Sequence, residues 1–234
     1  MQKTNSKVYS LVIAISFIVM SLLGSVHFWS FNEAFYKSEH DKLILYGKHI
    51  SEYIGISDED LEKLTHFTLS YLNDPKASLD IQMNVNGKQR EIFTDDEKAH
   101  MVDVRNLNLA ANYLLFDSAV VFVAFMAIYI FRKYPVSVLF SNYKKILMYI
   151  MIFIGIIGIW VLIDFDGFWT QFHHVFFPSN DLWLLDLRSD ILIMIVPPEF
   201  FNHLVVTIVV TFVSLVLGFY LILYLLNKKE KIND

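Results

Sequence analysis

The chain contains no cysteine, so disulfide bonds, thiolate nucleophiles and thiolate zinc sites are all excluded. Its few glycines form neither a P-loop nor a dinucleotide-binding fingerprint, and nothing in the sequence supports ATP-driven chemistry. Charged residues are also scarce, at 18%, whereas 55% of the residues are hydrophobic and the mean hydropathy is +0.46. An ordinary soluble domain does not have this balance, so the sequence indicates a membrane protein.

Four apolar segments are long enough to cross a hydrocarbon core about 30 Å thick, which takes about 20 helical residues. They cover residues 8–29, 113–131, 146–163 and 204–226. The first follows two lysines, as the apolar part of a signal peptide would. However, its apolar stretch is too long, and bulky residues replace the small-residue cleavage site. We therefore expect residues 1–32 to hold a short tail and a retained membrane anchor.

Positive charges beside the helix ends predict the orientation, because such residues favour the cytoplasmic side. They precede the first segment, separate the second from the third and follow the fourth: Lys3, Lys7, Arg132, Lys133, Lys144, Lys145, Lys228, Lys229 and Lys231. We therefore expect both termini, the 132–145 loop and the 227–234 tail inside, and residues 33–112 and 164–203 outside. All eight histidines then belong to the outer segments or to outer helix ends.

The longer outer segment predicts a small cap made of a helix and a β-hairpin. Residues 57–72 have the apolar spacing of an amphipathic helix, with a capping serine and acidic residues at its start. Residues 81–85 and 89–93 flank Asn86-Gly87, a pair that favours a type I′ turn. The expected fold class is thus an α-helical integral membrane protein with four transmembrane helices and an extracytoplasmic helix-plus-hairpin cap.

Another helix is predicted to start at Thr94, because Thr94 and Glu97 form a capping box. It places Glu97, His100 and Asp103 at three-residue steps, roughly on one face. The same helix continues through Arg105 toward the second membrane segment. One interpretation is a histidine held by a carboxylate near the membrane surface, and the other is an exposed helical turn with a charge pair. Spacing alone favours the exposed turn.

The second outer segment carries two adjacent histidines between aromatic residues, in the stretch Gln-Phe-His-His-Val-Phe-Phe at 171–177. The charge of histidine changes near physiological pH, so a histidine beside lipid headgroups could act as acid and base on a lipid. Adjacent residues of a helix point in different directions, so at most one of His173 and His174 should face a given site. Taken alone, each fits an interfacial aromatic companion better than a catalyst.

Asp190 opens the apolar run 191–196, and a carboxylate at membrane depth is costly enough to be a functional candidate. An interfacial N-cap explains the same residue equally well. Asp117, Asp164 and Asp166 lie near the ends of the expected helices, where they are expected to mark the membrane interface.

Two motifs resemble those of one protein family. Residues 97–104 carry an acidic residue, a histidine and Asp-Val just before the second membrane helix. The second motif combines Phe-His-x-x-Phe-Phe at 172–177 with a tryptophan, an aspartate and Pro-Glu-Phe-Phe at 198–201. In this order, and with this chain length and four-helix topology, they resemble the lipoprotein intramolecular transacylases of Gram-positive bacteria, the Lit family. The resemblance implies that His100 and His173 are the functional histidines.

Five further residues are expected to support these two histidines: Glu97, Asp103, Arg105, Trp183 and Asp190. The sequence departs from the family pattern at two places. A second histidine, His174, follows His173, and the proline of the second motif is doubled at 197–198.

The resemblance implies transfer of the sn-2 acyl chain of a lipoprotein's diacylglyceryl cysteine to that cysteine's own α-amino group. Ester aminolysis requires no energy cofactor, and we expect neither a cofactor nor a metal ion. The amine has a reference pKa of about 7.7–8.0 and must lose a proton, and general acid–base help contributes about 10² to 10⁴-fold. We assign His100 as the base, oriented by Asp103 or Glu97, and His173 as the polariser or acid. The reverse assignment and a transient acyl-histidine both stay open.

The expected partners are a diacylglyceryl lipoprotein in the outer leaflet of the bacterial plasma membrane and the phospholipid bilayer. No nucleic acid partner is expected, and a monomer is the working assumption. Two other functions stay open. A membrane metal-dependent hydrolase could use His100, His173 and Asp190 as ligands, although the sequence has no His-Glu-x-x-His pair. A non-enzymatic outer module could use its histidines as pH reporters.

Overall fold

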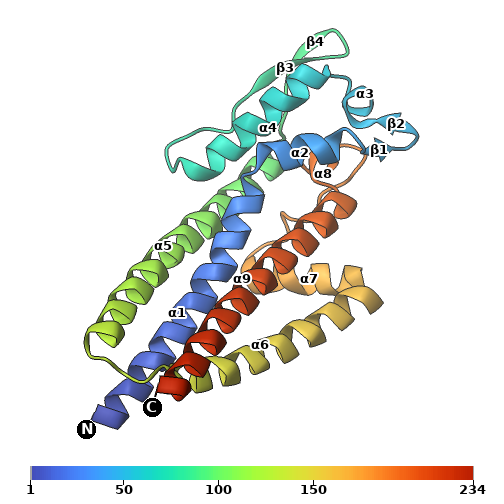
Figure 1. Ribbon diagram of the computed structural model, residues 1–234. Coiled ribbons are helices and arrows are strands. Elements are labelled where there is room, and N and C mark those ends of the chain that lie inside the picture. Colours follow the sequence, from blue (N-terminus) through green and yellow to red (C-terminus); the bar gives the residue numbers. More distant parts are fainter. Residues whose placement is uncertain (1, 234) are drawn as a thin grey trace. The chain divides into compact units, whose positions relative to one another are not determined.

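Helices dominate the computed structural model, which describes residues 2–233 and the side chains of residues 5–232. Figure 1 shows the helices and the short strands. In chain order they are α1 (Gln2–Ser30), α2 (Glu33–His40), β1 (Ile44–Leu45), β2 (Lys48–His49), α3 (Ile50–Ile54), α4 (Asp58–Asn73), β3 (Gln82–Val85), β4 (Lys88–Glu91), α5 (Asp95–Phe131), α6 (Val136–Ile163), α7 (Phe165–Phe176), α8 (Ile191–Ile195) and α9 (Pro198–Asn233).

The four expected apolar helices are confirmed as α1, α5, α6 and α9, each long and apolar enough to cross a membrane. Each extends beyond its apolar segment, because polar residues continue the backbone hydrogen bonding until a turn or proline interrupts it. The link between α5 and α6 is therefore only residues 132–135 rather than 132–145. It ends at Pro135, and proline disfavours helical backbone in the residue before it. The doubled proline at 197–198 similarly marks the start of α9, where Pro198 is the first helical residue.

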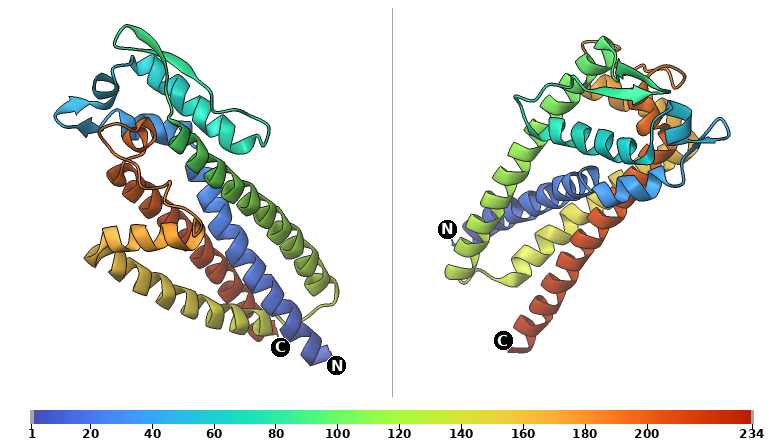
Figure 2. Two further views of the ribbon diagram at one scale, coloured as in Figure 1. Left: turned by 180° about the vertical axis from the view of Figure 1, so that it is seen from behind. Right: turned by 90° about the horizontal axis from the view of Figure 1, so that it is seen from above.

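The described chain divides into two compact units. The helix unit comprises the chain before His27, residues 112–171 and the chain from Ile208, and the cap unit comprises residues 27–111 and 172–207. Within the helix unit, α1 is the most buried of the apolar helices, and it lies between α5 and α9 (Figures 1 and 2). Tyr9 of α1 contacts Phe125 of α5, and Phe17 of α1 stacks on Phe219 of α9.

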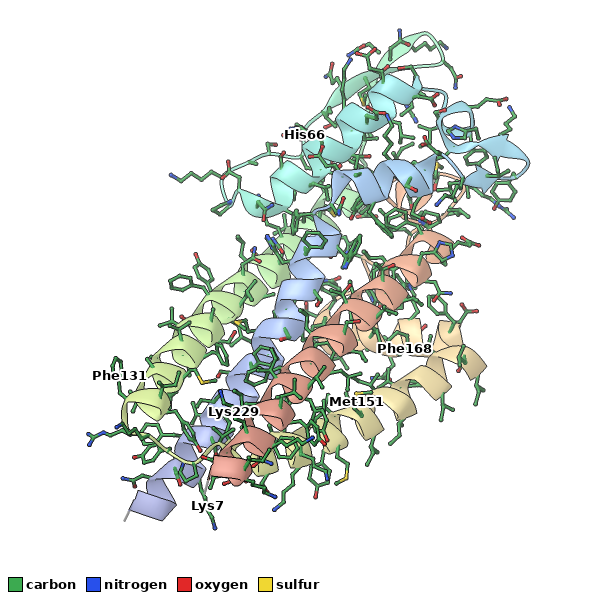
Figure 3. The ribbon with its side chains drawn as sticks, in the orientation of Figure 1. Lys7, His66, Phe131, Met151, Phe168 and Lys229 are labelled. Carbon is green, nitrogen blue, oxygen red and sulfur yellow. The ribbon has the colours of Figure 1, made fainter. Side chains whose placement is uncertain are left out.

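One end of the helix unit gathers the N-terminal part of α1, the α5–α6 link and the C-terminal part of α9, as Figures 1 and 2 show. Three hydrogen bonds hold this arrangement. Asn142 of α6 donates to Ser10 of α1 at 2.6 Å, and Glu230 of α9 accepts from the backbone amides of Val136 and Ser137 at 3.0 Å each. The cationic residues beside these helix ends therefore share one end of the unit. Figure 3 shows Lys7 and Lys229 there.

The cap unit has its own apolar core, to which α3, α4, α8 and the β3–β4 hairpin contribute. The helix expected over 57–72 is confirmed as α4, and the Ser57 hydroxyl accepts from the amide of Asp60 at 3.0 Å. The hairpin expected around Asn86-Gly87 is confirmed as β3 and β4. Both turn residues have positive φ, +51° and +81°, as a type I′ turn requires.

Several elements of the cap unit were not predicted. Strands β1 and β2 form a second antiparallel hairpin whose turn, Tyr46-Gly47, has φ values of +50° and +81°. Tyrosine is not among the residues that favour this turn, so the sequence carries no strong hairpin signal there. The short helices α2, α3 and α8 and the amphipathic helix α7 were likewise not predicted. They are too short for a clear periodic pattern, or they adjoin longer apolar runs.

Candidate functional site

His100 lies in the second turn of α5, within the cap unit. The capping box expected at the start of this helix is confirmed: the Thr94 amide donates to Glu97 at 2.7 Å, and the Glu97 amide donates to the Thr94 hydroxyl at 3.3 Å. His100 is 7% exposed, so it is a buried residue and not part of an exposed turn. Residue spacing alone favoured the exposed turn. Spacing along a helix does not show which other elements pack against a given face, and here that packing buries His100.

His173, on α7, lies beside His100 although 73 positions separate them in the chain. Their ring centroids are 6.4 Å apart, with an interplanar angle of 36°. Phe177, one turn after His173, presents its ring edge-on to His100 at 5.3 Å. The two histidines singled out by the sequence are therefore neighbours inside the cap unit, close enough for one ester group to contact both.

The two adjacent histidines of α7 differ as the helix geometry predicts. His173 is 5% exposed and stacks face to face on Trp183, with centroids 4.6 Å apart and an interplanar angle of 22°. His174 is exposed and meets the same indole edge-on at 5.5 Å. His174 therefore lies on the outer side of the tryptophan, whereas His173 belongs to the buried pair.

Burial controls the charge state of His100. This residue lies among the charged first turns of α5, ahead of the apolar part that begins near residue 113. The pKa of His100 is lowered to about 4, mainly by burial and also by the neighbouring His173, while the charge of Asp103 partly opposes both effects. His100 is therefore neutral at neutral pH and able to accept a proton. Among the described residues, its buried Nδ1 atom has no hydrogen-bond partner.

Asp103, one turn after His100, is held by a residue that the sequence analysis missed. The side-chain amide of Asn180 donates to Asp103 Oδ2 at 2.9 Å, and Asn180 Oδ1 accepts from the amide of Leu182 at 3.1 Å. Asp103 acts on His100 through its charge, because its carboxylate raises the pKa of the ring. Asn180 thus ties the loop after α7 to α5. A lone asparagine in a loop carries no sequence signal for such a contact.

Glu97 does not orient His100. Its side chain is fully buried, and while one oxygen caps α5, the other accepts from the amide of Leu192 at 2.7 Å. The carboxylate therefore joins the start of α5 to α8. Its position on the same face as His100 suggested a direct partner, but each of its two oxygens accepts from a backbone amide at a helix start.

Arg105 and Asp190 also bind backbone rather than the histidines. Arg105 donates to the carbonyl of Ala77 at 2.9 Å and lies over the Tyr71 ring at 4.4 Å. Asp190 accepts from the amide of Asp186 at 2.7 Å, and the apolar run after it is α8, which packs in the core of the cap unit. Asp190 stands at the N-cap position of α8, although its side chain makes no capping hydrogen bond to that helix.

The ligand set of the alternative metal site does not assemble. Over the described residues, no group of three histidine, aspartate or glutamate side chains could hold a metal ion, so His100, His173 and Asp190 do not form such a group. The site is instead a pair of histidines with one aromatic ring on either side, Phe177 against His100 and Trp183 against His173.

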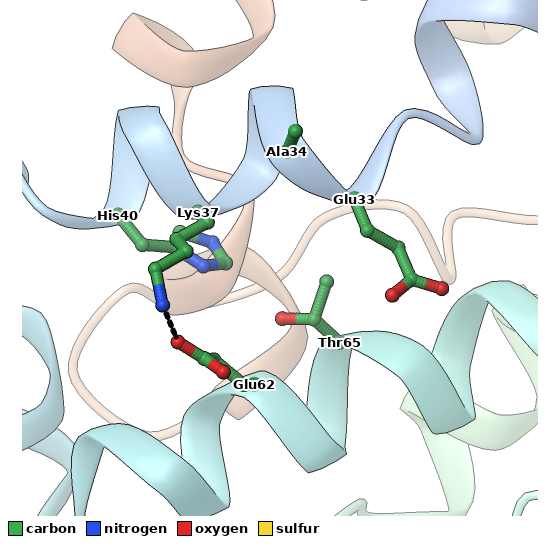
Figure 4. A pocket seen from close by; sticks show the side chains of 6 residues that line it. All are labelled: Glu33, Ala34, Lys37, His40, Glu62 and Thr65. Atoms are coloured by element: carbon green, nitrogen blue, oxygen red, sulfur yellow. Dashed lines mark hydrogen bonds and ion pairs between the residues drawn. The ribbon is translucent and has the colours of Figure 1, made fainter.

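The cap unit also contains a cavity of about 170 Å³ away from the histidine pair. Figure 4 shows its lining residues: Glu33, Ala34, Lys37, His40, Glu62 and Thr65. Lys37 forms an ion pair with Glu62, and the Glu33 carboxylate forms a hydrogen bond with His66 at 2.8 Å. His40 donates to the carbonyl of Ile195 at 2.8 Å, and burial lowers the pKa of His40. These contacts join α2 to α4 and α8, and we assign this cavity no function.

Comparison with known proteins identifies the family of this chain. The family model for the lipoprotein intramolecular transacylase Lit matches residues 11–201. This chain belongs to the Lit family. It is therefore a membrane-integral transferase of a family that modifies lipoproteins. No curated protein sequence matches the chain.

Solved structures share the fold of this Lit family member. The in meso structure of the lipoprotein intramolecular transacylase Lit from Bacillus cereus superposes with a TM-score of 0.80 at 19% identity, covering 100% of both chains. A variant of that protein with one histidine replaced by arginine gives a TM-score of 0.73 at 18% identity, covering 100% of this chain and 96% of that one. At these identities the likeness establishes the fold, including the four apolar helices.

Proposed function

We propose that this protein moves the sn-2 acyl chain of a diacylglyceryl-cysteine lipoprotein onto the α-amino group of the same cysteine, forming the N-acyl lyso form. Family membership supports the general reaction, an intramolecular transacylation on a lipoprotein. The observation that carries the finer proposal is the buried pair of His100 and His173, whose rings lie 6.4 Å apart. Two histidines at this spacing can contact the amine and the ester of one substrate.

His100 is the base in this proposal. It is neutral at working pH, because burial lowers its pKa to about 4. A base this weak is still sufficient, since the amine nitrogen becomes a much stronger acid once it has bonded to the carbonyl carbon. Asp103 favours the protonated ring that results, and Asn180 holds Asp103 in place.

His173 is the acid. The face of the Trp183 indole lies against its ring, a position in which the electron-rich face favours a cation. In the reaction, the amine nitrogen bonds to the ester carbonyl carbon and gives its proton to His100. The bond from that carbon to the glycerol oxygen breaks, and the oxygen takes a proton from His173. Passing one proton from His100 to His173 restores the starting state.

We also propose that the cap unit faces the outside of the plasma membrane, where the diacylglyceryl cysteine lies in the outer leaflet. The cationic ends of α1 and α9 and the α5–α6 link share one end of the helix unit, and such charges favour the cytoplasm. Both termini are then cytoplasmic, and the phospholipid bilayer surrounds the four apolar helices.

The test is expression in a host whose lipoproteins are diacylated and have a free amino terminus, followed by mass spectrometry of those lipoproteins. The wild-type protein should convert them to the N-acyl lyso form. His100→Ala and His173→Ala should each lower the rate by about 10² to 10⁴-fold, since each removes a proton-transfer group. His174→Ala is the matched control and should retain activity. Normal conversion by both alanine variants would remove the histidines from the mechanism.

His100→Gln separates two roles for His100. Glutamine can donate a hydrogen bond but cannot take up a proton to become a cation. Loss of conversion in His100→Gln is expected for the base assigned here. Activity close to that of the wild type would instead make His100 a positioning residue.

A further inference from the structure

Trp183 carries a buried hydrogen-bond donor without a partner beside the histidine pair. The side chain is 8% exposed, and its Nε1 atom is buried with no acceptor among the described residues. Buried polar atoms are hydrogen-bonded in the large majority of cases, so an exception calls for an explanation. The other unpartnered atom at this site is Nδ1 of His100, which belongs to the proposed base. Two unsatisfied polar groups therefore flank His173.

The local structure fixes the orientation of the indole. Its face stacks on His173, and the His174 ring packs against it edge-on. Two short-range backbone hydrogen bonds hold the loop at this point: Leu184 donates to Asp181 and Leu185 donates to Trp183, both at 3.0 Å. The N–H group lies in the plane of the indole, and the indole is stacked on the His173 imidazole at an interplanar angle of 22°. The N–H bond is therefore roughly parallel to the imidazole plane and is not directed at the face of that ring. The donor is thus held beside the proposed acid.

Acyl transfer needs such a donor. When the amine attacks, the electron pair of the carbonyl π bond moves onto the oxygen, which becomes negatively charged until the bond to glycerol breaks. Donors held in position for this oxygen, in a site closed to water, commonly make a large contribution to rate. His100 and His173 are already occupied by the two proton transfers. An indole N–H only donates and does not titrate, so it cannot compete for those protons.

We propose that Trp183 is a further catalytic residue, whose indole N–H donates a hydrogen bond to the carbonyl oxygen of the acyl chain as that oxygen becomes negative. The inference rests on the proposed acyl transfer. Its proton stays on the indole nitrogen throughout: the amine proton goes to His100, and the glycerol oxygen receives its proton from His173. Trp183 therefore stabilises the tetrahedral intermediate without taking part in the proton balance.

The test compares variants of the full-length protein in proteoliposomes, with a synthetic diacylglyceryl lipopeptide as substrate. Replacement of Trp183 by 3-benzothienylalanine substitutes sulfur for the N–H group and keeps the size of the ring system and its stacking on His173. This variant and Trp183→Phe should lower the single-turnover rate by about 10² to 10³-fold, as loss of an oxyanion donor does elsewhere. The lipopeptide concentration giving half-maximal rate should change little. Trp29→Phe, the same change elsewhere in the cap unit, should leave the rate near that of the wild type.

The outcomes separate the two proposals. If the wild-type protein converts the lipopeptide and the benzothienyl variant does so equally fast, the N–H group has no catalytic role, and a slow Trp183→Phe variant then reports lost packing alone. If Trp183→Phe fails to fold, the benzothienyl variant, which keeps the ring shape, still decides the question. If the wild-type protein itself leaves the lipopeptide unchanged, the proposed function fails and this inference fails with it.

Discussion

The helix unit and the cap unit differ in where they place their large apolar side chains. In the helix unit large apolar residues lie on the surface: Phe131, which projects from the end of α5 in Figure 3, is 86% exposed. In the cap unit residues such as Ile50 and Leu64 are fully buried, and charged residues line the surface. The difference shows that one unit is built for contact with lipid and the other for contact with water.

The two units also differ in the kind of polar side chain that they bury. The helix unit buries small hydroxyl groups along α1, such as Ser10 and Ser25, which bond back to carbonyls of their own helix. The cap unit buries Glu97, His100 and His173. Buried ionisable groups are costly unless they are paired or hydrogen-bonded, and the two buried histidines are the pair on which the proposed acyl transfer rests.

The largest expected effect concerns the proposed orientation, in which the cap unit lies outside the membrane and the cationic helix ends lie on the cytoplasmic side. The chain has no cysteine, so a single introduced one can be labelled without background. A cysteine at the exposed Ser78 of the cap unit should react fully with an impermeant thiol reagent in intact cells. A cysteine at Ser141, near the start of α6, should react only after the membrane is opened. The reverse pattern would invert the proposed orientation.

A large effect on stability is expected from Glu97→Ala. The change leaves the buried amide of Leu192 without its acceptor, which costs about 1 to 3 kcal/mol, and it also removes the cap from the amide of Thr94. Hydrogen exchange should accelerate at the start of α5 and in α8, with little change in the helix unit. Glu91→Ala is the control, because it removes only an exposed ion pair with Lys98. Equal exchange in the two variants would contradict the role given to Glu97.

Asn180→Asp should reduce activity by roughly tenfold to a hundredfold, because it sets two carboxylates against each other and displaces Asp103. The double exchange Asp103→Asn with Asn180→Asp rebuilds the amide–carboxylate hydrogen bond and should recover part of the rate. Asn84→Asp, the same change at an exposed position of β3, serves as the control. No recovery in the double variant would mean that the position of the charge matters more than the hydrogen bond.

The smallest effect concerns the protonation of His100. Burial lowers its pKa to about 4, against about 6.5 in an unfolded chain. The unfolded state therefore binds more protons between these values, and the stability that His100 contributes is lost as pH falls from 6.5 toward 4. Nitrogen NMR of the labelled ring should show the neutral form at pH 6. Phe177→Ala, which uncovers the ring, should raise the midpoint; an unshifted midpoint near 6.5 in the wild type would contradict the burial argument.

The features predicted correctly from the sequence depend on short-range signals. Four helices follow from apolar length, because a bilayer requires internally satisfied backbone. The β3–β4 hairpin follows from Asn86-Gly87, and the start of α5 follows from the capping box of Thr94 and Glu97. His100 and His173 were selected by motif resemblance, since neither residue is distinguishable from an exposed histidine by its immediate neighbours.

The sequence by itself determined the membrane class and the four long helices, because these depend on composition and apolar length, and the motif resemblance singled out the two histidines. Tertiary structure alone decided that His100 is buried, that Asn180 holds Asp103 and that Glu97 caps two helices at once. It also placed the run after Asp190 in a protein core, and it left the Trp183 N–H beside His173 with no acceptor in the part of the chain that the structure describes. The physical reason is that a polar side chain bonds to the groups that packing brings near it, and the deciding partners here, Asn180 for Asp103 and Leu192 for Glu97, lie more than seventy residues away in the chain.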